Sequence, residues 1–172
     1  MRQEPTIPEG LETVPTMNGI TIRRVWRSWK IVPLALFAGI WDSFLVFWYV
    51  KVLATPNPPL MAVIFPIGHI AVGIGITYYV IASAFNKTDV VISPSGVRVV
   101  SGPAPWFGNK EVNAAEIVAV LVRERAGNRG RITYSVMHVD AANKERRLLS
   151  YLAESDQAHF IAQTIRDGLG LQ

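Results

Sequence analysis

Two long apolar segments constrain this chain more than any other feature. Residues 31–50, IVPLALFAGIWDSFLVFWYV, carry one charged group, Asp42. Residues 60–85 contain no Asp, Glu, Lys or Arg and a single histidine, His69. A helix needs about 20 apolar residues to cross the hydrocarbon core of a bilayer. Helices in soluble cores keep a polar stripe, which these segments lack. The sequence therefore predicts a transmembrane helical hairpin, 31–85, with helices at about 31–53 and 60–85.

Composition narrows the chemistry. Half of the 172 residues are hydrophobic, 17% are charged, and there is no cysteine, which excludes disulfides, thiolate metal sites and a cysteine nucleophile. The first 19 residues are polar and rich in Pro and Gly, so they are not expected to be a signal peptide. We expect residues 1–30 to form an N-terminal tail with a basic and aromatic end.

Basic residues orient the predicted hairpin. Arg23, Arg24, Arg27 and Lys30 precede the first helix, whereas the connecting loop carries Lys51 alone. By the positive-inside rule, a multi-pass membrane protein with this distribution of charge would have both termini in the cytoplasm.

The segment ITIRRVWRSWK, 20–30, leaves two interpretations open. It can add a strand to a sheet, or it can lie at the membrane interface and contact anionic lipid. The residues predicted for such an interface are Arg23, Arg24, Trp26, Arg27, Trp29 and Lys30. Near the other end of the first helix, Trp48 and Tyr49 fit either interfacial anchoring or helix packing.

Residues 86–172 predict a small α+β domain. Two β-branched runs flank the turn Pro-Ser-Gly at 94–96, and three further strand-like runs cover 116–124, 131–139 and 145–152. Ser155 is expected to cap a final helix, which Gly168 and Gly170 end. Its apolar face comprises Ala158, Ile161, Ala162, Ile165 and Leu169. The fold expected is an antiparallel β-meander closed by a C-terminal helix.

The order of hairpin, NKTDVVISPSGVRVVSGPAPW, further strands and terminal helix resembles bacterial membrane-anchored PH-like domain proteins of an uncharacterised subgroup. The resemblance covers about residues 30–172 and includes a GP-x-PW element, Gly102, Pro103, Pro105 and Trp106. It implies a PH-like cytoplasmic domain after the hairpin, in a multi-pass protein of the bacterial inner membrane. The Pro/Gly-rich loop GPAPWFG by itself allows two roles for Trp106, packing over the edge of the core or contact with a partner. PH domains that bind phosphoinositides carry basic residues in the first strand–strand loop, whereas PSG here has none.

Asp42 and His69 are predicted at similar depth. Counted from Asn57 in the loop, they lie 15 and 12 residues away, a depth difference of about 4–5 Å. A hydrogen bond between them would relieve the cost of burying either group. Such a pair can fix the register of the helices, contact a partner subunit or cofactor, or transfer protons.

A lone histidine among small residues also fits ligation of a porphyrin-type ring by His69. However, Gly68, Ala71, Gly75 and Ala82 share one helix face, and small residues on one face favour close helix packing. We therefore expect no cofactor, and assign these residues to packing or partner contact.

Three functions remain open. The sequence shows no nucleotide-binding loop, metal cluster, nucleophile–base pair or nucleic-acid motif, so no enzyme, nucleic-acid partner or small-molecule substrate is expected. We favour an accessory subunit of a multi-subunit membrane complex, photosynthetic or respiratory, whose partners are integral membrane subunits and the bilayer. The alternative is a stand-alone anchored binding module that recruits a protein or lipid. An intramembrane enzyme or proton carrier using Asp42 and His69 is the third.

Overall fold

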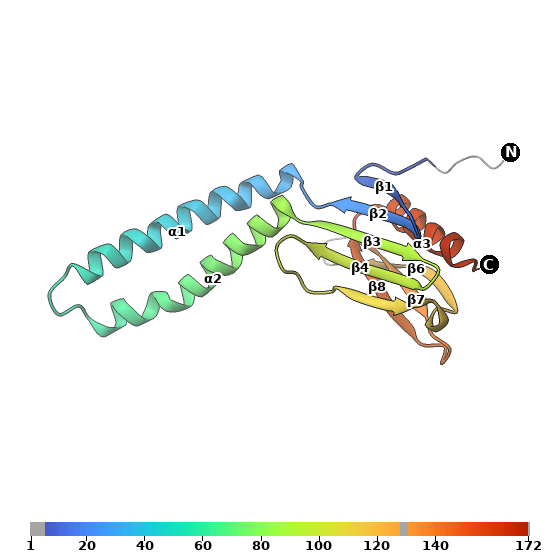
Figure 1. The fold of residues 1–172 in the computed structure, drawn as a ribbon. Coiled ribbons are helices and arrows are strands. Elements are labelled where there is room, and N and C mark those ends of the chain that lie inside the picture. Colours follow the sequence, from blue (N-terminus) through green and yellow to red (C-terminus); the bar gives the residue numbers. More distant parts are fainter. Residues whose placement is uncertain (1–5, 128–130, 172) are drawn as a thin grey trace. The chain divides into compact units, whose positions relative to one another are not determined.

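The computed structural model describes residues 6–127 and 131–171 and divides the chain into two compact units (Figure 1). The sheet domain comprises Met1–Val25 and Lys87–Gln172, and the helical hairpin comprises Trp26–Asn86. The chain therefore leaves the sheet domain to build the hairpin and then returns to it.

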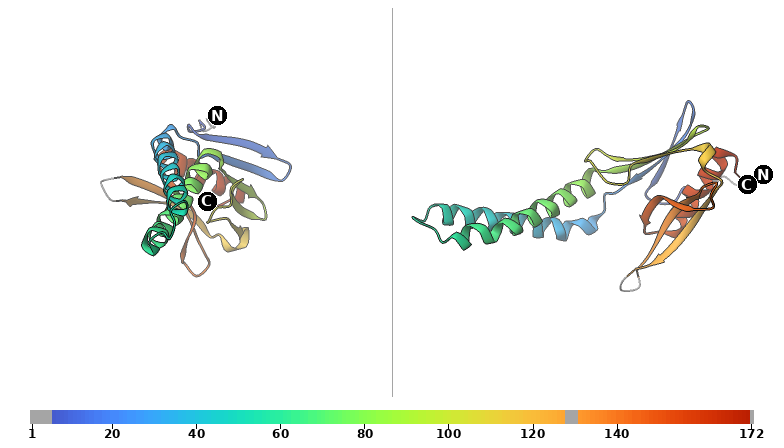
Figure 2. Two further views of the ribbon diagram at one scale, coloured as in Figure 1. Left: turned by 90° about the vertical axis from the view of Figure 1, so that its left-hand side faces the viewer. Right: turned by 90° about the horizontal axis from the view of Figure 1, so that it is seen from below.

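The hairpin consists of a short 3-10 helix, Trp29–Ile31, followed by α1, Val32–Leu53, and α2, Leu60–Phe85. α1 and α2 contact each other, and the right-hand view of Figure 2 shows them as an elongated pair. Both are long and apolar enough to cross a membrane, and only 11% of the most apolar window of each helix is buried within the chain. The two predicted helices are thus confirmed in position and polarity, and their apolar side chains are not the core of this chain.

The larger sheet has five antiparallel strands in chain order: β1, Leu11–Thr16; β2, Gly19–Val25; β3, Lys87–Ser93; β4, Gly96–Gly102; and β5, Lys110–Asn113. β2 pairs with β3, from Ile20 opposite Ile92 to Val25 opposite Lys87. The whole hairpin is thus an insertion between two neighbouring strands. Half of the segment expected as a tail, residues 11–25, forms β1, a turn and β2, so the strand interpretation of ITIRRV is confirmed.

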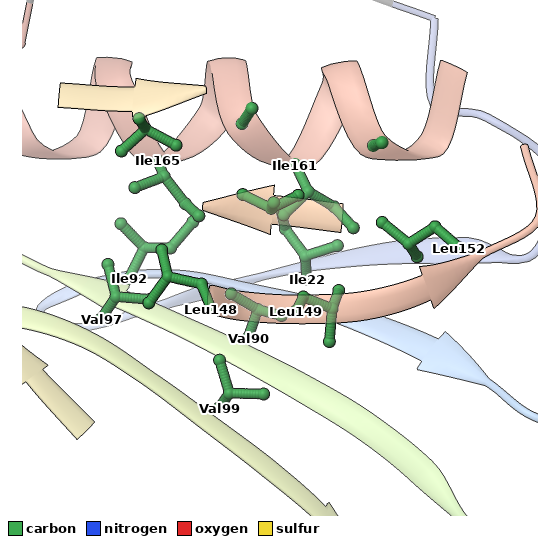
Figure 3. Packing of buried hydrophobic residues seen from close by; sticks show 14 of the residues in the cluster. Ile22, Val90, Ile92, Val97, Val99, Leu148, Leu149, Leu152, Ile161 and Ile165 are labelled. Atoms are coloured by element: carbon green, nitrogen blue, oxygen red, sulfur yellow. The ribbon is translucent and has the colours of Figure 1, made fainter. Parts of the chain in front are cut away.

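The smaller sheet contains β6, Ala119–Ala126; β7, Ile132–Val139; and β8, Glu145–Leu152, and α3, Ser155–Leu169, follows it. α3 contacts strands of both sheets. Figure 3 shows Ile161 and Ile165 of α3 in one cluster with Ile22, Ile92 and other aliphatic side chains from both sheets. The antiparallel sheets and the C-terminal helix are confirmed, and they enclose a single aliphatic core.

The domain differs from the expected meander in two respects. The strands divide into two sheets, because the 3-10 helix Ala114–Glu116 follows β5 and β6 pairs with β7 instead. Ser155 is the first residue of α3 rather than its cap; Glu154 takes that position and makes no side-chain cap hydrogen bond.

Two glycines have different roles at the end of α3. Gly170 ends the helix in the left-handed conformation, with φ of 67°, as predicted. Gly168 lies inside the helix, where an added Cβ would lie 2.6 Å from Ile92 Cγ2. Gly168 therefore permits close packing of α3 on β3.

Candidate functional site: the two faces of the helical hairpin

One face of the hairpin is aromatic. The Trp41 and His69 rings stack with centroids 5.7 Å apart, and Phe65 and Phe37 flank them at 4.9 Å from His69 and 5.5 Å from Trp41. His69 Nδ1 lies 3.4 Å from the carbonyl oxygen of Phe65, one turn earlier. The histidine is therefore placed among the chain's own aromatic rings.

Pro66 creates a specific hydrogen-bonding requirement in α2. Proline has no N–H, so the carbonyl of Ala62, four residues earlier, lacks its helical donor. Trp48 of α1 supplies one: its Nε1–H donates to Ala62 O over 3.1 Å. The neighbouring Tyr49 hydroxyl donates to Val63 O over 2.8 Å. Trp48 and Tyr49 thus make contacts between the helices. Of the two roles predicted for them, interfacial anchoring and helix packing, the structure shows helix packing.

Asp42 lies toward the opposite face. Its Oδ2 accepts a hydrogen bond of 2.6 Å from Thr77 Oγ1 in α2. Gly73 makes the approach possible, because an added Cβ there would lie 2.6 Å from Asp42 Oδ1 and 3.2 Å from Trp41. Thr77 was not predicted as a site residue, and Gly73 was not on the helix face predicted for packing. The two residues are four apart, which places them on one helix face, and this spacing was the available signal.

The structure does not bring Asp42 and His69 together. Among the described residues, the hydrogen bond expected between them is replaced by separate contacts to Thr77 and to Phe65. Asp42 and His69 do lie at similar positions along the hairpin, as predicted, because Trp41, the neighbour of Asp42, stacks on His69. Consecutive residues point about 100° apart around a helix. Asp42 therefore contacts a different side of α2, at Thr77, from the histidine that its neighbour contacts.

The small residues expected to pack together lie largely outside the helix contact. An added Cβ at Gly68 or Gly75 would meet nothing within 4 Å, and Ala71 is exposed. Ala82 is fully buried. Gly73, which is not on the predicted face, is the small residue that meets α1. The face of Gly68, Ala71 and Gly75 is therefore left to contacts outside the hairpin.

A groove runs along the side of the hairpin that carries Asp42. It has a volume of about 650 Å³ and is lined mainly by aliphatic and tyrosine side chains of both helices. Asp42 and Thr77 also line it. The groove thus combines an apolar wall with a carboxylate.

Two of the residues predicted at a membrane interface are structural in the sheet. Arg23 makes a bidentate pair with Asp89 across β2 and β3, at 2.8 and 3.0 Å, and this pairing raises the pKa of Arg23. Arg24 donates to the carbonyl of Tyr151 over 3.3 Å, and burial lowers its pKa.

The other four interface candidates belong to the hairpin unit. Trp26 is half-buried, and its backbone N–H donates to Asn86 O over 3.2 Å. Arg27, Trp29 and Lys30 are exposed immediately before α1, with Trp29 78% exposed. These three residues remain candidates for contact with a membrane surface.

Trp106 lies in the loop between β4 and β5. It is half-buried, whereas the adjacent Phe107 is 94% exposed. Trp106 was the predicted contact residue of this loop, but Phe107 is the more exposed of the two.

Within residues 6–127 and 131–171, no group of three or more His, Asp or Glu side chains is arranged to hold a metal ion. Ligation of a porphyrin-type ring by His69 stays the less favoured of the two interpretations that the sequence allows. Comparison with protein-family models and with curated proteins finds no match to this sequence.

Proposed function

We propose that this chain is a non-catalytic accessory subunit of a multi-subunit complex in a bacterial inner membrane. Its hairpin would pack against other membrane-spanning helices, and its sheet domain would dock on the cytoplasmic surface of the assembly. The observation that carries the proposal is Asp42, a half-buried carboxylate midway along an otherwise apolar hairpin.

Asp42 separates this proposal from the stand-alone module. An anchor needs only an apolar surface, and an aspartate at the centre of a membrane helix costs about 2.5–3.5 kcal/mol even on lenient scales. The hydrogen bond from Thr77 offsets only part of that, since such bonds in membranes contribute on average about 0.6 kcal/mol. A carboxylate in the bilayer only destabilises a simple anchor, whereas in a subunit of a complex it can bind a polar or charged side chain of another helix.

Length and charge support a bilayer location. At 1.5 Å per residue, α1 and α2 are about 33 and 39 Å long, against about 30 Å of hydrocarbon. The exposed Arg27, Lys30 and Lys87 flank one end of the hairpin, and Lys51 lies near the loop. This asymmetry favours a cytoplasmic sheet domain. Because β2 pairs with β3, both parts of that domain must lie on one side of any bilayer that the hairpin crosses.

The PH-like interpretation stays part of this proposal. The resemblance implies an antiparallel β-meander closed by a C-terminal helix; the structure has antiparallel strands and that helix, with the strands divided into two sheets. The turn between β3 and β4, at Pro94 and Ser95, has no basic side chain to hold a phosphorylated headgroup. We therefore assign the domain to protein docking, with Phe107 as the first residue to test.

The test is purification of the tagged full-length chain from its native membranes in a mild detergent. We expect it to migrate with other integral membrane subunits in fixed stoichiometry. Recovery as a free monomer, from membranes in which the chain is abundant, would overturn the proposal. If that monomer also bound a cytosolic protein through the sheet domain, the stand-alone module would replace it.

A further inference from the structure

The groove on the Asp42 side of the hairpin is a long apolar surface with one acidic group. Leu45, Tyr49, Ile74 and Tyr78 are among the residues that line it, together with Asp42 and Thr77. Ile74 is 66% exposed. The chain itself leaves this surface open to whatever surrounds the hairpin.

Asp42 lies halfway along α1, which runs from Val32 to Leu53, so it is about 15 Å from either end of the helix. An ionised carboxylate has about four acceptor positions. Among the described residues, Thr77 Oγ1 is the one side-chain donor to it. In a bilayer, the remaining acceptor positions have little access to water.

We propose that the groove receives a membrane-spanning helix of a different subunit, and that this helix carries a lysine or arginine at the depth of Asp42. The inference rests on the proposed function and names the partner's chemistry. Intramembrane charges occur mostly in pairs inside helix bundles, where each relieves the burial cost of the other.

Two other occupants fit less well. A lipid acyl chain fills an apolar groove but offers the carboxylate no donor. A second copy of this chain has no lysine or arginine within residues 31–50 or 60–85, and its His69, which lies at a similar depth, is stacked on its own Trp41. Charge complementarity therefore selects a different subunit.

Site-specific crosslinking tests the location. Because the chain has no cysteine, Ile74→Cys and Val72→Cys each give a single site for a benzophenone–maleimide label in native membranes. Ile74 lines the groove, whereas Val72, 54% exposed and at similar depth, points about 200° away around α2.

We expect the label at position 74 to capture one helix of another subunit, at least fivefold more efficiently than the label at 72. Mass spectrometry of the crosslink should find a lysine or arginine within about one turn of the attachment point. Capture of lipid alone, of a second copy, or of a helix without such a residue would overturn the inference. Equal capture of one helix from both positions would do the same.

Asp42→Asn tests the charge in the full-length chain. The carboxamide oxygen can still accept from Thr77, so the hairpin contact is kept while the charge is lost. We expect at least tenfold less partner to co-purify, with partial recovery in Asp42→Glu. Undiminished co-purification of the asparagine variant would refute a cationic partner.

Two bulky substitutions test the groove even if the Asp42 variants fail to accumulate in the membrane. Ile74→Trp would fill the groove and should release the partner, whereas Val72→Trp should not. A retained partner in Ile74→Trp counts against the groove. If the wild-type chain is itself free in detergent, the proposed function fails as well. If it is in a complex but only position 72 captures the partner, this inference alone fails.

Discussion

The contact between Trp48 and the carbonyl freed by Pro66 can be measured as a coupling energy. Trp48→Phe keeps an aromatic ring beside Phe44 but removes the N–H that donates to Ala62 O. With Pro66 in place, Ala62 O then has no helical donor. Pro66→Ala restores a backbone N–H four residues after Ala62, so in that background the helix itself satisfies this carbonyl.

The expected coupling is about 1 kcal/mol. Hydrogen bonds between membrane helices contribute about 0.6 kcal/mol on average and about 1.7 at most, and a carbonyl left unpaired in hydrocarbon costs more than a bond merely exchanged. Trp48→Phe should therefore destabilise the wild type by roughly 1 kcal/mol more than it destabilises Pro66→Ala. The change in ring packing caused by Trp48→Phe is the same with and without Pro66→Ala, so it cancels in this double-mutant cycle.

The full-length chain is unfolded in mixed micelles by titration with a denaturing detergent, and the loss of helix is followed by circular dichroism. The titration gives the free energy of unfolding of the wild type, the two single variants and the double variant. Trp41→Phe is the matched control. Trp41 Nε1–H donates to His69 O, whose helical donor, the N–H of Gly73, does not depend on Pro66. Its effect should be the same with and without Pro66→Ala. If Trp48→Phe lowers the free energy of unfolding equally in the wild type and in Pro66→Ala, within about 0.3 kcal/mol, Trp48 does not replace the helical donor that Pro66 removes.

Three further predictions concern single residues. Gly73→Ala should weaken the hairpin by about 1–2 kcal/mol, because its Cβ must displace Asp42 from Thr77, whereas Gly75→Ala, which meets nothing, should be neutral or stabilising in the same detergent titration. His138 is 3% exposed, and burial, followed by the charge of Arg146, lowers its pKa. The unfolded chain therefore takes up a proton first, and urea stability of the sheet domain should fall below about pH 6.5, with a flatter profile in His138→Gln; an unchanged profile would exclude this histidine as the cause. Gly96→Ala should cost about 3 kcal/mol or more and abolish the cooperative urea transition of the sheet, since φ is 151° and the new Cβ would lie 2.2 Å from a backbone carbonyl oxygen of β5; normal folding of this variant would contradict the strand register.

The parts of this fold that the sequence predicts are those with strong local patterns. The apolar runs of α1 and α2 and the apolar face of α3 at Ala158, Ile161 and Ile165 were identified within a few residues of their observed limits. β1 was missed because it is an edge strand of mixed polarity with Pro15 near its end. Its neighbour β2 pairs with a strand that follows the whole hairpin, and such distant pairing leaves no local signal.

The site was harder to predict than the fold, because it depends on the rotation of α1 against α2. Counting along the chain gave the depth of Asp42, but it could not show that Trp41, not Asp42, turns toward His69. The link from Trp48 to the carbonyl freed by Pro66 likewise needs the register of two helices. Pro66 itself was visible in the sequence and implied a carbonyl without its helical donor. Trp48 was visible as a possible donor, but the sequence did not show that the two lie together.

The insertion of the hairpin between β2 and β3 makes the order of synthesis matter. β2 leaves the ribosome well before β3, so it can pair with β1 at once, but its other edge must wait for β3 until both long helices have been made. Ile22 of β2 belongs to the same buried cluster as Ile161 of α3, near the other end of the chain. The sheet can therefore close only after Val25 and Lys87 have been brought together, which requires the hairpin to have folded back on itself. In a cell, a protease-resistant sheet domain would consequently report that the hairpin has been assembled, and a chain stalled before that point would expose β2 to degradation.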